Sequence, residues 1–262
     1  MAELTVAGRP LGSFARAPFE RHQLTCLRGI LTAYEKPLDG LGRYALGRGT
    51  YPHRIAVRTP LGVMRPTLRS HDDLLTATEV FCRMDYPAGD DVEVVVDVGS
   101  NIGLSALYFL TRNRRARVHL FEPDPRNLPR LRENLAGFED RYELDEAAVS
   151  DTAGREAFGL EPTGRYGGLG WPGEKTIEVQ TRAINDVLEA VLEREKHIDV
   201  LKLDTEDYEI LTVRAIRPDL LGRIGRIYLD AAPAEPLYPE RFTQRQYGTV
   251  LQMKHRGLDR AD

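Results

Sequence analysis

The chain has 262 residues, which suits one α/β domain with additions and is short for two full domains. Charged residues make up 29% and hydrophobic residues 42%, and no apolar run is long enough to cross a bilayer, so we expect no membrane partner. The net charge of −4 argues against nucleic acid as a partner, because phosphate binding requires clustered positive charge.

The start of the chain and the two cysteines indicate the cellular compartment in which we expect the protein. Residues 1–5 lack the basic start and the apolar core of a signal peptide. Cys26 and Cys82 are far apart in sequence, and neither lies in the paired spacing typical of a zinc site or a disulfide framework. We therefore expect a cytoplasmic protein whose thiols are buried and reduced.

Residues 1–90 are expected to form an N-terminal cap. Apolar residues at helical spacing come first, then two β-forming stretches around a proline turn, then N-capping side chains ahead of another apolar run. These patterns predict a helix, a small hairpin and a second helix, which begin near Arg21, Arg54 and His71. The breaker-rich run 86–91 ends the cap, so the main domain is expected over 91–262.

Strand and helix signals alternate through the main domain, which predicts an α/β fold with a mostly parallel sheet and helices on both faces. The tail over 242–256 is expected to add an antiparallel strand pair. The other expected strands are 94–98, 117–121, 142–149, 198–204 and 224–230. The expected helices are 103–112, 125–135 with Asp124 as N-cap, 184–194 and 206–216.

The region 155–183 is less regular than its surroundings. Residues 156–160 and 176–180 could pair as strands across the glycine-rich loop 164–173, which holds the single tryptophan, Trp171. Such a loop could be a lid over a site or a plain surface loop, and both interpretations stay open.

The most informative motif is the strand and turn that run from Val94 to Gly103. An apolar strand leads into a turn with two glycines, and Glu122 follows at the tip of the next strand, where a carboxylate can accept hydrogen bonds from ribose hydroxyls. A dinucleotide site would need a further glycine where Asn101 stands, so the backbone path suited to a pyrophosphate is missing. The motif therefore predicts a nucleoside site without a pyrophosphate.

From about His71 onward the chain resembles the FkbM family of methyltransferases. The resemblance depends on the order and spacing of four segments: 97–103, 121–125, 147–151 with Gly154 following, and 201–206. It implies the class I methyltransferase fold, a Rossmann-like sandwich. The chain departs from the family at Asp207, where a glycine is common, and this departure leaves the shape of that turn open.

The resemblance implies an O-methyltransferase that uses S-adenosylmethionine (SAM) and releases S-adenosylhomocysteine (SAH). The implied acceptor is a small hydroxylated molecule such as a sugar or glycosylated natural product, as in antibiotic biosynthesis. The residues expected to bind the cofactor are Asp97, Gly99, Ser100, Asn101, Gly103, Glu122, Ser150 and Asp204. The expected catalytic residues, at the carboxyl end of the fourth strand, are Asp204 and Glu206.

Individual roles follow from position and chemistry. Asp97 ends a buried strand, so its carboxylate is expected to accept N–H groups of the turn. Ser150 and the backbone of 147–149 are expected to face the adenine, and Asp204 is our first choice for the acceptor side. Asp204 and Asp230 could hold Mg²⁺ through oxygen ligands, and the metal stays undecided.

Alternatives remain. An NAD-dependent oxidoreductase is disfavoured by Asn101, and a methyltransferase fold used only for binding is a further candidate. His255 has the unperturbed pKa of a general base, yet a surface histidine is the simpler interpretation. The position methylated, N- or C-methylation, and oligomeric state, including a homodimer, are left open by the sequence.

Overall fold

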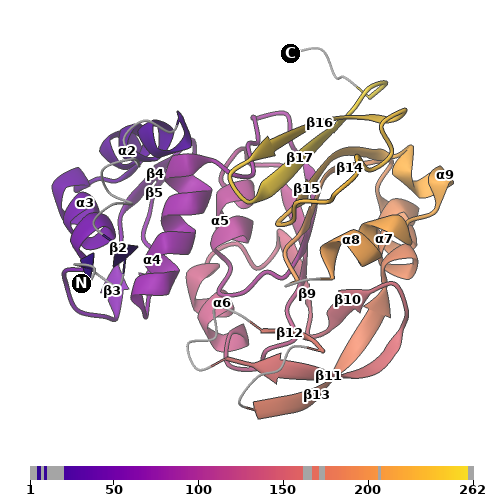
Figure 1. Ribbon diagram of the computed structural model, residues 1–262, viewed down its shortest axis with the longest axis horizontal. Helices are drawn as coiled ribbons and strands as arrows, with labels where there is room; N and C mark the ends of the chain where they lie inside the picture. Colours follow the sequence, from indigo (N-terminus) through magenta and orange to yellow (C-terminus); the bar gives the residue numbers. More distant parts are fainter. Residues whose placement is uncertain are drawn as a thin grey trace. The chain divides into compact units, whose positions relative to one another are not determined.

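The computed structural model describes residues 5–6, 9–10, 21–161, 167–170, 175–205 and 208–258 (Figure 1). The chain divides into two compact units, Met1–Pro87 and Ala88–Asp262, and each is described by itself. The role of the first unit as a cap stays a prediction. No helix among the described residues is both long enough and apolar enough to cross a membrane.

The first unit contains the expected helix, hairpin and second helix, together with a helix that we did not predict. The unpredicted helix, α3 (Pro37–Leu46), includes two glycines, which lower helix propensity. One of them, Gly40, is buried, and a Cβ there would lie 2.4 Å from Tyr34 Cδ2, so packing accounts for it. The other elements are α2 (Arg21–Ala33), α4 (His71–Thr78), a π-helical segment (Glu79–Arg83), β1 (Thr5–Val6), β2 (Arg9–Pro10), β3 (His53–Arg54), β4 (Val57–Thr59), β5 (Gly62–Met64) and β6 (Thr67–Leu68).

Helix α4, the second of the two helices predicted for this unit, is capped one residue earlier than the sequence indicates. Ser70 is the N-cap of α4, and its Oγ accepts from the N–H of Asp73 at 3.1 Å. Asp73 Oδ2 in turn accepts from the N–H of Ser70 at 3.2 Å. This reciprocal capping box satisfies two backbone donors that the helix leaves unpaired.

The second unit is built on a seven-stranded sheet, as the α/β prediction requires (Figure 1). The strand order is β16-β17-β15-β14-β7-β8-β9, parallel from β15 to β9, with β16 and β17 as the expected antiparallel pair. The strands are β7 (Val94–Val98), β8 (Arg117–Phe121), β9 (Tyr142–Asp145), β14 (Ile198–Leu203), β15 (Ile224–Leu229), β16 (Phe242–Tyr247) and β17 (Val250–His255). The chain runs outward from β7 to β9 and then returns to β14, so the order reverses between β7 and β14.

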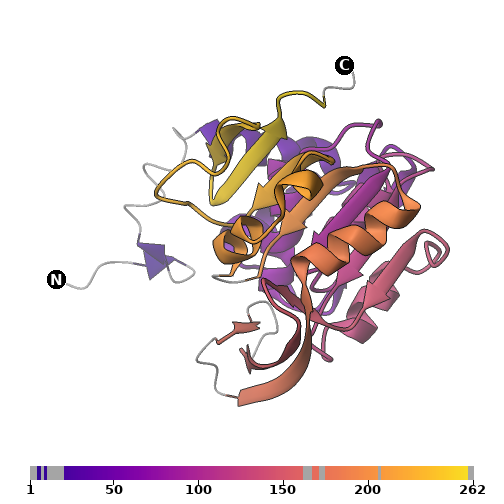
Figure 2. The ribbon, with the colours of Figure 1, turned by 90° about the vertical axis from the view of Figure 1, so that its right-hand side faces the viewer.

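Helices cover both faces of this sheet. Figures 1 and 2 show α5 and α6 on one face and α7, α8 and α9 on the other. Every residue of β7 is buried, as expected for a central strand of a doubly wound sheet. The helices are α5 (Leu104–Leu110), α6 (Leu128–Asn134), α7 (Ile184–Arg194), α8 (Glu209–Arg214) and α9 (Pro218–Leu221).

The prediction that Asp124 caps the helix after β8 is wrong. Helix α6 begins at Leu128, with Asn127 at the N-cap position. The Asp124 carboxylate instead accepts from the backbone N–H of Arg126 at 2.9 Å and pairs with the guanidinium of the same residue. Asp124 therefore fixes a turn that precedes the helix.

The predicted single strand over 142–149 is also wrong, because the chain changes sheets within it. β9 ends at Asp145, and the next strand, β10 (Ala148–Ser150), pairs in parallel with β13 (Lys175–Ala183) in a second sheet. This sheet has the order β10-β13-β11-β12, with β11 (Gly154–Leu160) and β12 (Gly167–Leu169). β11 pairs antiparallel with β13, as the sequence predicted. Residues 162–166 and 171–174, including Trp171, lie outside the described residues.

Candidate functional site

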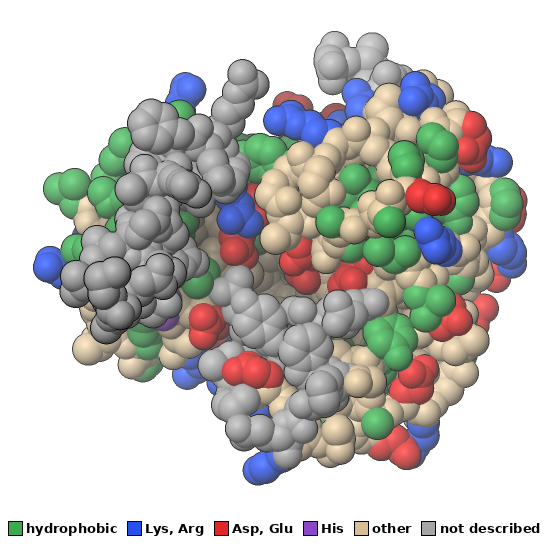
Figure 3. Space-filling model, in the orientation of Figure 1, with side chains coloured by type: hydrophobic (Ala, Val, Ile, Leu, Met, Phe, Trp, Pro, Cys, Tyr) green, Lys and Arg blue, Asp and Glu red, His purple; other side chains and the backbone are tan. Residues whose placement is uncertain are grey.

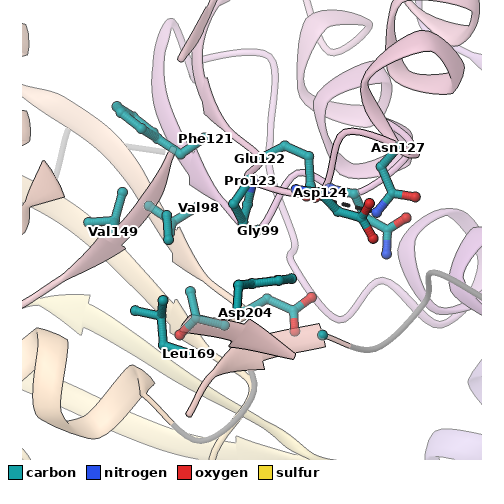
Figure 4. A pocket seen from close by; sticks show the side chains of 15 residues that line it. Val98, Gly99, Phe121, Glu122, Pro123, Asp124, Asn127, Val149, Leu169 and Asp204 are labelled. Carbon is teal, nitrogen blue, oxygen red and sulfur yellow. Dashed lines mark hydrogen bonds between the residues drawn. The ribbon is translucent and has the colours of Figure 1, made fainter. Parts of the chain in front are cut away.

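A pocket opens at the carboxyl ends of β7, β8 and β14, where the strand order reverses (Figure 4). Ligands of doubly wound sheets bind at such a switch point. The space within the pocket, including its open mouth, is about 590 Å³. Among the predicted site residues, the ones that line it are Gly99, Asn101, Glu122 and Asp204.

The tips of β7 and β14 are in close contact at Gly99. Gly99 has a φ of +76°, and a Cβ on it would lie 1.9 Å from the carbonyl oxygen of Asp204. The N–H of Asp204 donates to the carbonyl of Val98 at 3.2 Å, and the N–H of Gly99 donates to that of Phe121 at 3.0 Å. Glycine is therefore required at this position both by the backbone conformation and by the neighbouring strand.

Glu122 connects the loops that follow β7 and β8. One carboxylate oxygen accepts from the N–H of Asn101 at 2.7 Å, and the other accepts from the N–H of Asp124 at 2.9 Å and from Asn127 Nδ2 at 3.3 Å. Burial raises the pKa of Glu122 to about 7, although these donors favour the charged form. The oxygen that accepts from Asn101 retains acceptor capacity for a ligand in the pocket, whereas the other oxygen already accepts from two donors.

The positive φ of Asn101, 48°, places its N–H toward Glu122. Its own Oδ1 accepts from the N–H of Ile102 at 2.7 Å, a local bond that helps an asparagine to adopt this conformation. Asn101 thus serves the turn in place of the middle glycine of a dinucleotide motif.

Asp97 lies beneath this turn and takes part in a buried ion pair that sequence reasoning missed. Its fully buried carboxylate accepts from Ser105 Oγ at 2.6 Å and pairs with Lys202 Nζ at 3.0 Å. We expected the carboxylate to accept N–H groups of the turn, and its partners are these side chains instead. A lysine within the apolar strand 198–203 was the available signal, because a buried lysine requires a counter-ion.

The remaining predicted cofactor residues contact other parts of the protein. Ser100 Oγ donates to the carbonyl of Asp97 at 2.8 Å, and Ser150 Oγ donates to Asp151 Oδ1 at 2.9 Å. Gly103, with a φ of +82°, packs against α6 at the start of α5. These three residues do not line the pocket, whereas Ala148 and Val149 do. Glu206 and Asp207 lie outside the described residues.

Acidic side chains gather at the ends of β14 and β15. Burial raises the pKa of Glu209, and the charges of Asp204 and Asp230 add to that effect. Glu209 Oε1 accepts from the N–H of Thr205 at 2.6 Å. No group of three or more His, Cys, Asp or Glu among the described residues is arranged to hold a metal ion. The suggested Asp204 and Asp230 pair stays a prediction, and we derive no step through a metal.

Together, the seven-stranded sheet with helices on both faces and the pocket at its switch point define a doubly wound α/β domain with a candidate ligand site. Residues 97–229 match the family described as the methyltransferase FkbM domain, and the chain belongs to this family. The predicted family resemblance is thereby confirmed.

Curated relatives are similar to this chain over short segments. The 2-O-methyltransferase NoeI of Sinorhizobium fredii is 46% identical over 65 residues, which are 25% of this chain and 26% of NoeI. The 31-O-demethyl-FK506 methyltransferase FkbM of Streptomyces tacrolimicus is 40% identical over 62 residues, 24% of each chain. The chain thus matches about a quarter of the length of these relatives.

A solved structure titled methyltransferase FkbM, from Methylobacillus flagellatus KT, is 15% identical to this chain. The likeness covers 92% of this chain and 60% of that one, with a TM-score of 0.46.

Proposed function

We propose that this protein is a SAM-dependent O-methyltransferase that acts on a small hydroxylated molecule. The observation that carries the proposal is the convergence of Gly99, Glu122 and Asp204 on one pocket within the family's domain. When bound, SAM supplies a methyl group made electrophilic by its sulfonium sulfur.

The pocket residues fit the parts of SAM. The Glu122 oxygen that accepts from Asn101 has acceptor capacity for a ribose hydroxyl, and Gly99 lines the pocket beside it. An apolar wall suits the adenine ring. This wall is made by Phe121, Val149, Phe158 and Leu169. The sulfonium is a cation, so an adjacent carboxylate such as Asp204 favours it.

Asp204 is proposed to take the proton of the acceptor hydroxyl. Its side chain is 31% exposed and lines the pocket, so both substrate and solvent protons can reach it. A positioned base of this kind contributes about 100-fold to 10,000-fold to a rate. Glu206 stays a second proposed catalytic residue.

The class of acceptor is proposed from the relatives and the surface. The names of NoeI and of the FK506 enzyme place their methylation on oxygen, which supports a hydroxyl acceptor on a sugar or natural product. On the face shown in Figure 3, the described acidic and basic side chains are interspersed over most of the surface, which favours a small molecule over nucleic acid.

Calorimetric titration with SAM and SAH, followed by SAH release assays on a panel of hydroxylated glycosides, tests the proposal. We expect micromolar binding of both ligands and turnover on at least one acceptor. Folded protein that binds neither ligand would overturn the proposal. Binding without turnover on any acceptor would favour the non-catalytic alternative, and tight binding of NADH would favour the oxidoreductase.

The affinity for SAH is expected to fall as the pH decreases below about 7, the raised pKa of Glu122. The ribose hydroxyls donate to the ionised carboxylate, so protonation competes with binding. Well below this pKa the ionised fraction falls about tenfold for each pH unit, and the affinity should follow. Titrations between about pH 5.5 and pH 8 measure the effect. The variant Glu122→Gln should bind weakly with no pH dependence in this range, and a flat wild-type profile would contradict the prediction.

A further inference from the structure

Lys202 is a buried cation that lies between the Gly99 turn and Asp204, two parts of the proposed active site. It lies on β14 with a side chain only 2% exposed, and in the parallel register it pairs with Asp97 of β7. Its ammonium has three protons and at least four oxygen partners. These partners include Asp97 Oδ1 at 3.0 Å, the Gly99 carbonyl at 3.0 Å, Asp204 Oδ2 at 3.5 Å and the Val98 carbonyl at 3.5 Å.

Neutralising Asp97 accounts for only part of this arrangement. Burial opposes the charge on Lys202, but Asp97 and Asp204 together outweigh burial and raise its pKa. Two carboxylates around one ammonium leave one negative charge in excess. Asp97 is fully buried and also held by Ser105, whereas Asp204 lines the pocket, so the excess charge faces the ligand.

Of the three contacts that Asp97 does not explain, two bear on methyl transfer. Through the Gly99 carbonyl, Lys202 holds the turn beside the proposed cofactor. Through Oδ2, it restricts rotation of the Asp204 carboxylate, the proposed base. Methyl transfer requires the acceptor oxygen, the methyl group and the sulfur in line, and a misplacement of about 1 Å can cost about 100-fold in rate.

We propose that Lys202 is a positioning residue that aligns the Gly99 turn with the Asp204 carboxylate, in addition to neutralising Asp97. This inference rests on the proposed function. It assigns to one buried side chain the alignment of the proposed cofactor site with the proposed base that faces the methyl acceptor.

The test compares two variants that both lack the charge of Asp97. Lys202→Met alone would leave Asp97 buried and unpaired, which is strongly destabilising. Asp97→Asn retains Lys202, whereas Asp97→Asn/Lys202→Met removes both buried charges and keeps similar side-chain volumes. Thermal unfolding establishes that each variant is folded, and SAH affinity and kcat are then measured on wild type and both variants.

We expect kcat of the double variant to be at least about 10-fold below that of Asp97→Asn, with SAH affinities of the two variants within about threefold. Equal kcat values, or a faster double variant, would show that Lys202 serves Asp97 alone and would overturn the proposal. Because wild type is assayed first, absence of SAM binding or turnover there would instead count against the proposed function.

Crystal structures of the two variants provide a readout that does not depend on turnover. We expect one orientation of the Asp204 carboxylate in Asp97→Asn and several, or a shifted one, in the double variant. The same single orientation in both would overturn the proposal, even where both variants are too slow to assay.

Discussion

Gly99→Ala is expected to destabilise the protein by about 2 to 5 kcal/mol. The added Cβ would lie 1.9 Å from the carbonyl oxygen of Asp204, so β7 and β14 would have to separate at the pocket. Overpacking of this kind costs about 1 to 3 kcal/mol, and a non-glycine residue at a φ of +76° adds about 1 to 2 kcal/mol. Urea unfolding followed by circular dichroism measures the loss.

Gly248→Ala is the matched control for this prediction. Gly248 has a φ of +61° in the turn between β16 and β17, and a Cβ there would meet nothing within 4 Å. It should therefore cost only the conformational part, about 1 to 2 kcal/mol. If both variants lose the same free energy of unfolding, the contact between Gly99 and β14 does not constrain this position.

Glu122→Ala is expected to weaken SAH binding by at least about 100-fold. The change removes the proposed acceptor of the ribose hydroxyls, and hydrogen bonds to charged groups are worth about 1.5 to 3 kcal/mol each. It also leaves the N–H groups of Asn101 and Asp124 without the acceptor that fixes their loops. Titration calorimetry at pH 8, at a temperature where the variant is folded, measures the affinity.

Asp145→Ala provides the control for Glu122→Ala. Asp145 ends the neighbouring parallel strand, β9, but does not line the pocket, and its carboxylate pairs with Arg182 near the surface. We expect SAH affinity within about twofold of wild type and a stability loss of at most about 1 kcal/mol. A loss of less than about fivefold for Glu122→Ala would argue that the ribose lies elsewhere.

Much of the candidate site was predictable because its residues come directly after individual strands. The buried run 94–98 marks β7, and the next strand ends at Phe121, immediately before Glu122. Carboxyl ends of adjacent parallel strands meet at one edge of a sheet, so chain order alone places Gly99 and Glu122 together. Ser150 was harder to place, because a turn after a strand looks the same whether or not its side chain faces a ligand.

The wrong predictions concern segments whose structure depends on contacts with neighbouring residues and strands. Sequence patterning does not show that the chain leaves the main sheet after Asp145, because Ala148 and Val149 are as apolar as a continued strand would be. Likewise, α6 begins at Leu128 rather than after Asp124, because the Asp124 carboxylate fixes a preceding turn with Arg126.

The sequence by itself determined the α/β class, the glycine turn, the carboxylate at Glu122 and the resemblance to the family, because each is written in residues close together in the chain. Only the tertiary structure decided that Lys202 lies between Asp97 and Asp204. It also decided that position 99 cannot carry a side chain, because the carbonyl of Asp204 is too close. The physical reason is that the register between β7 and β14 depends on how both strands pack in the core, and no local pattern in either strand specifies it.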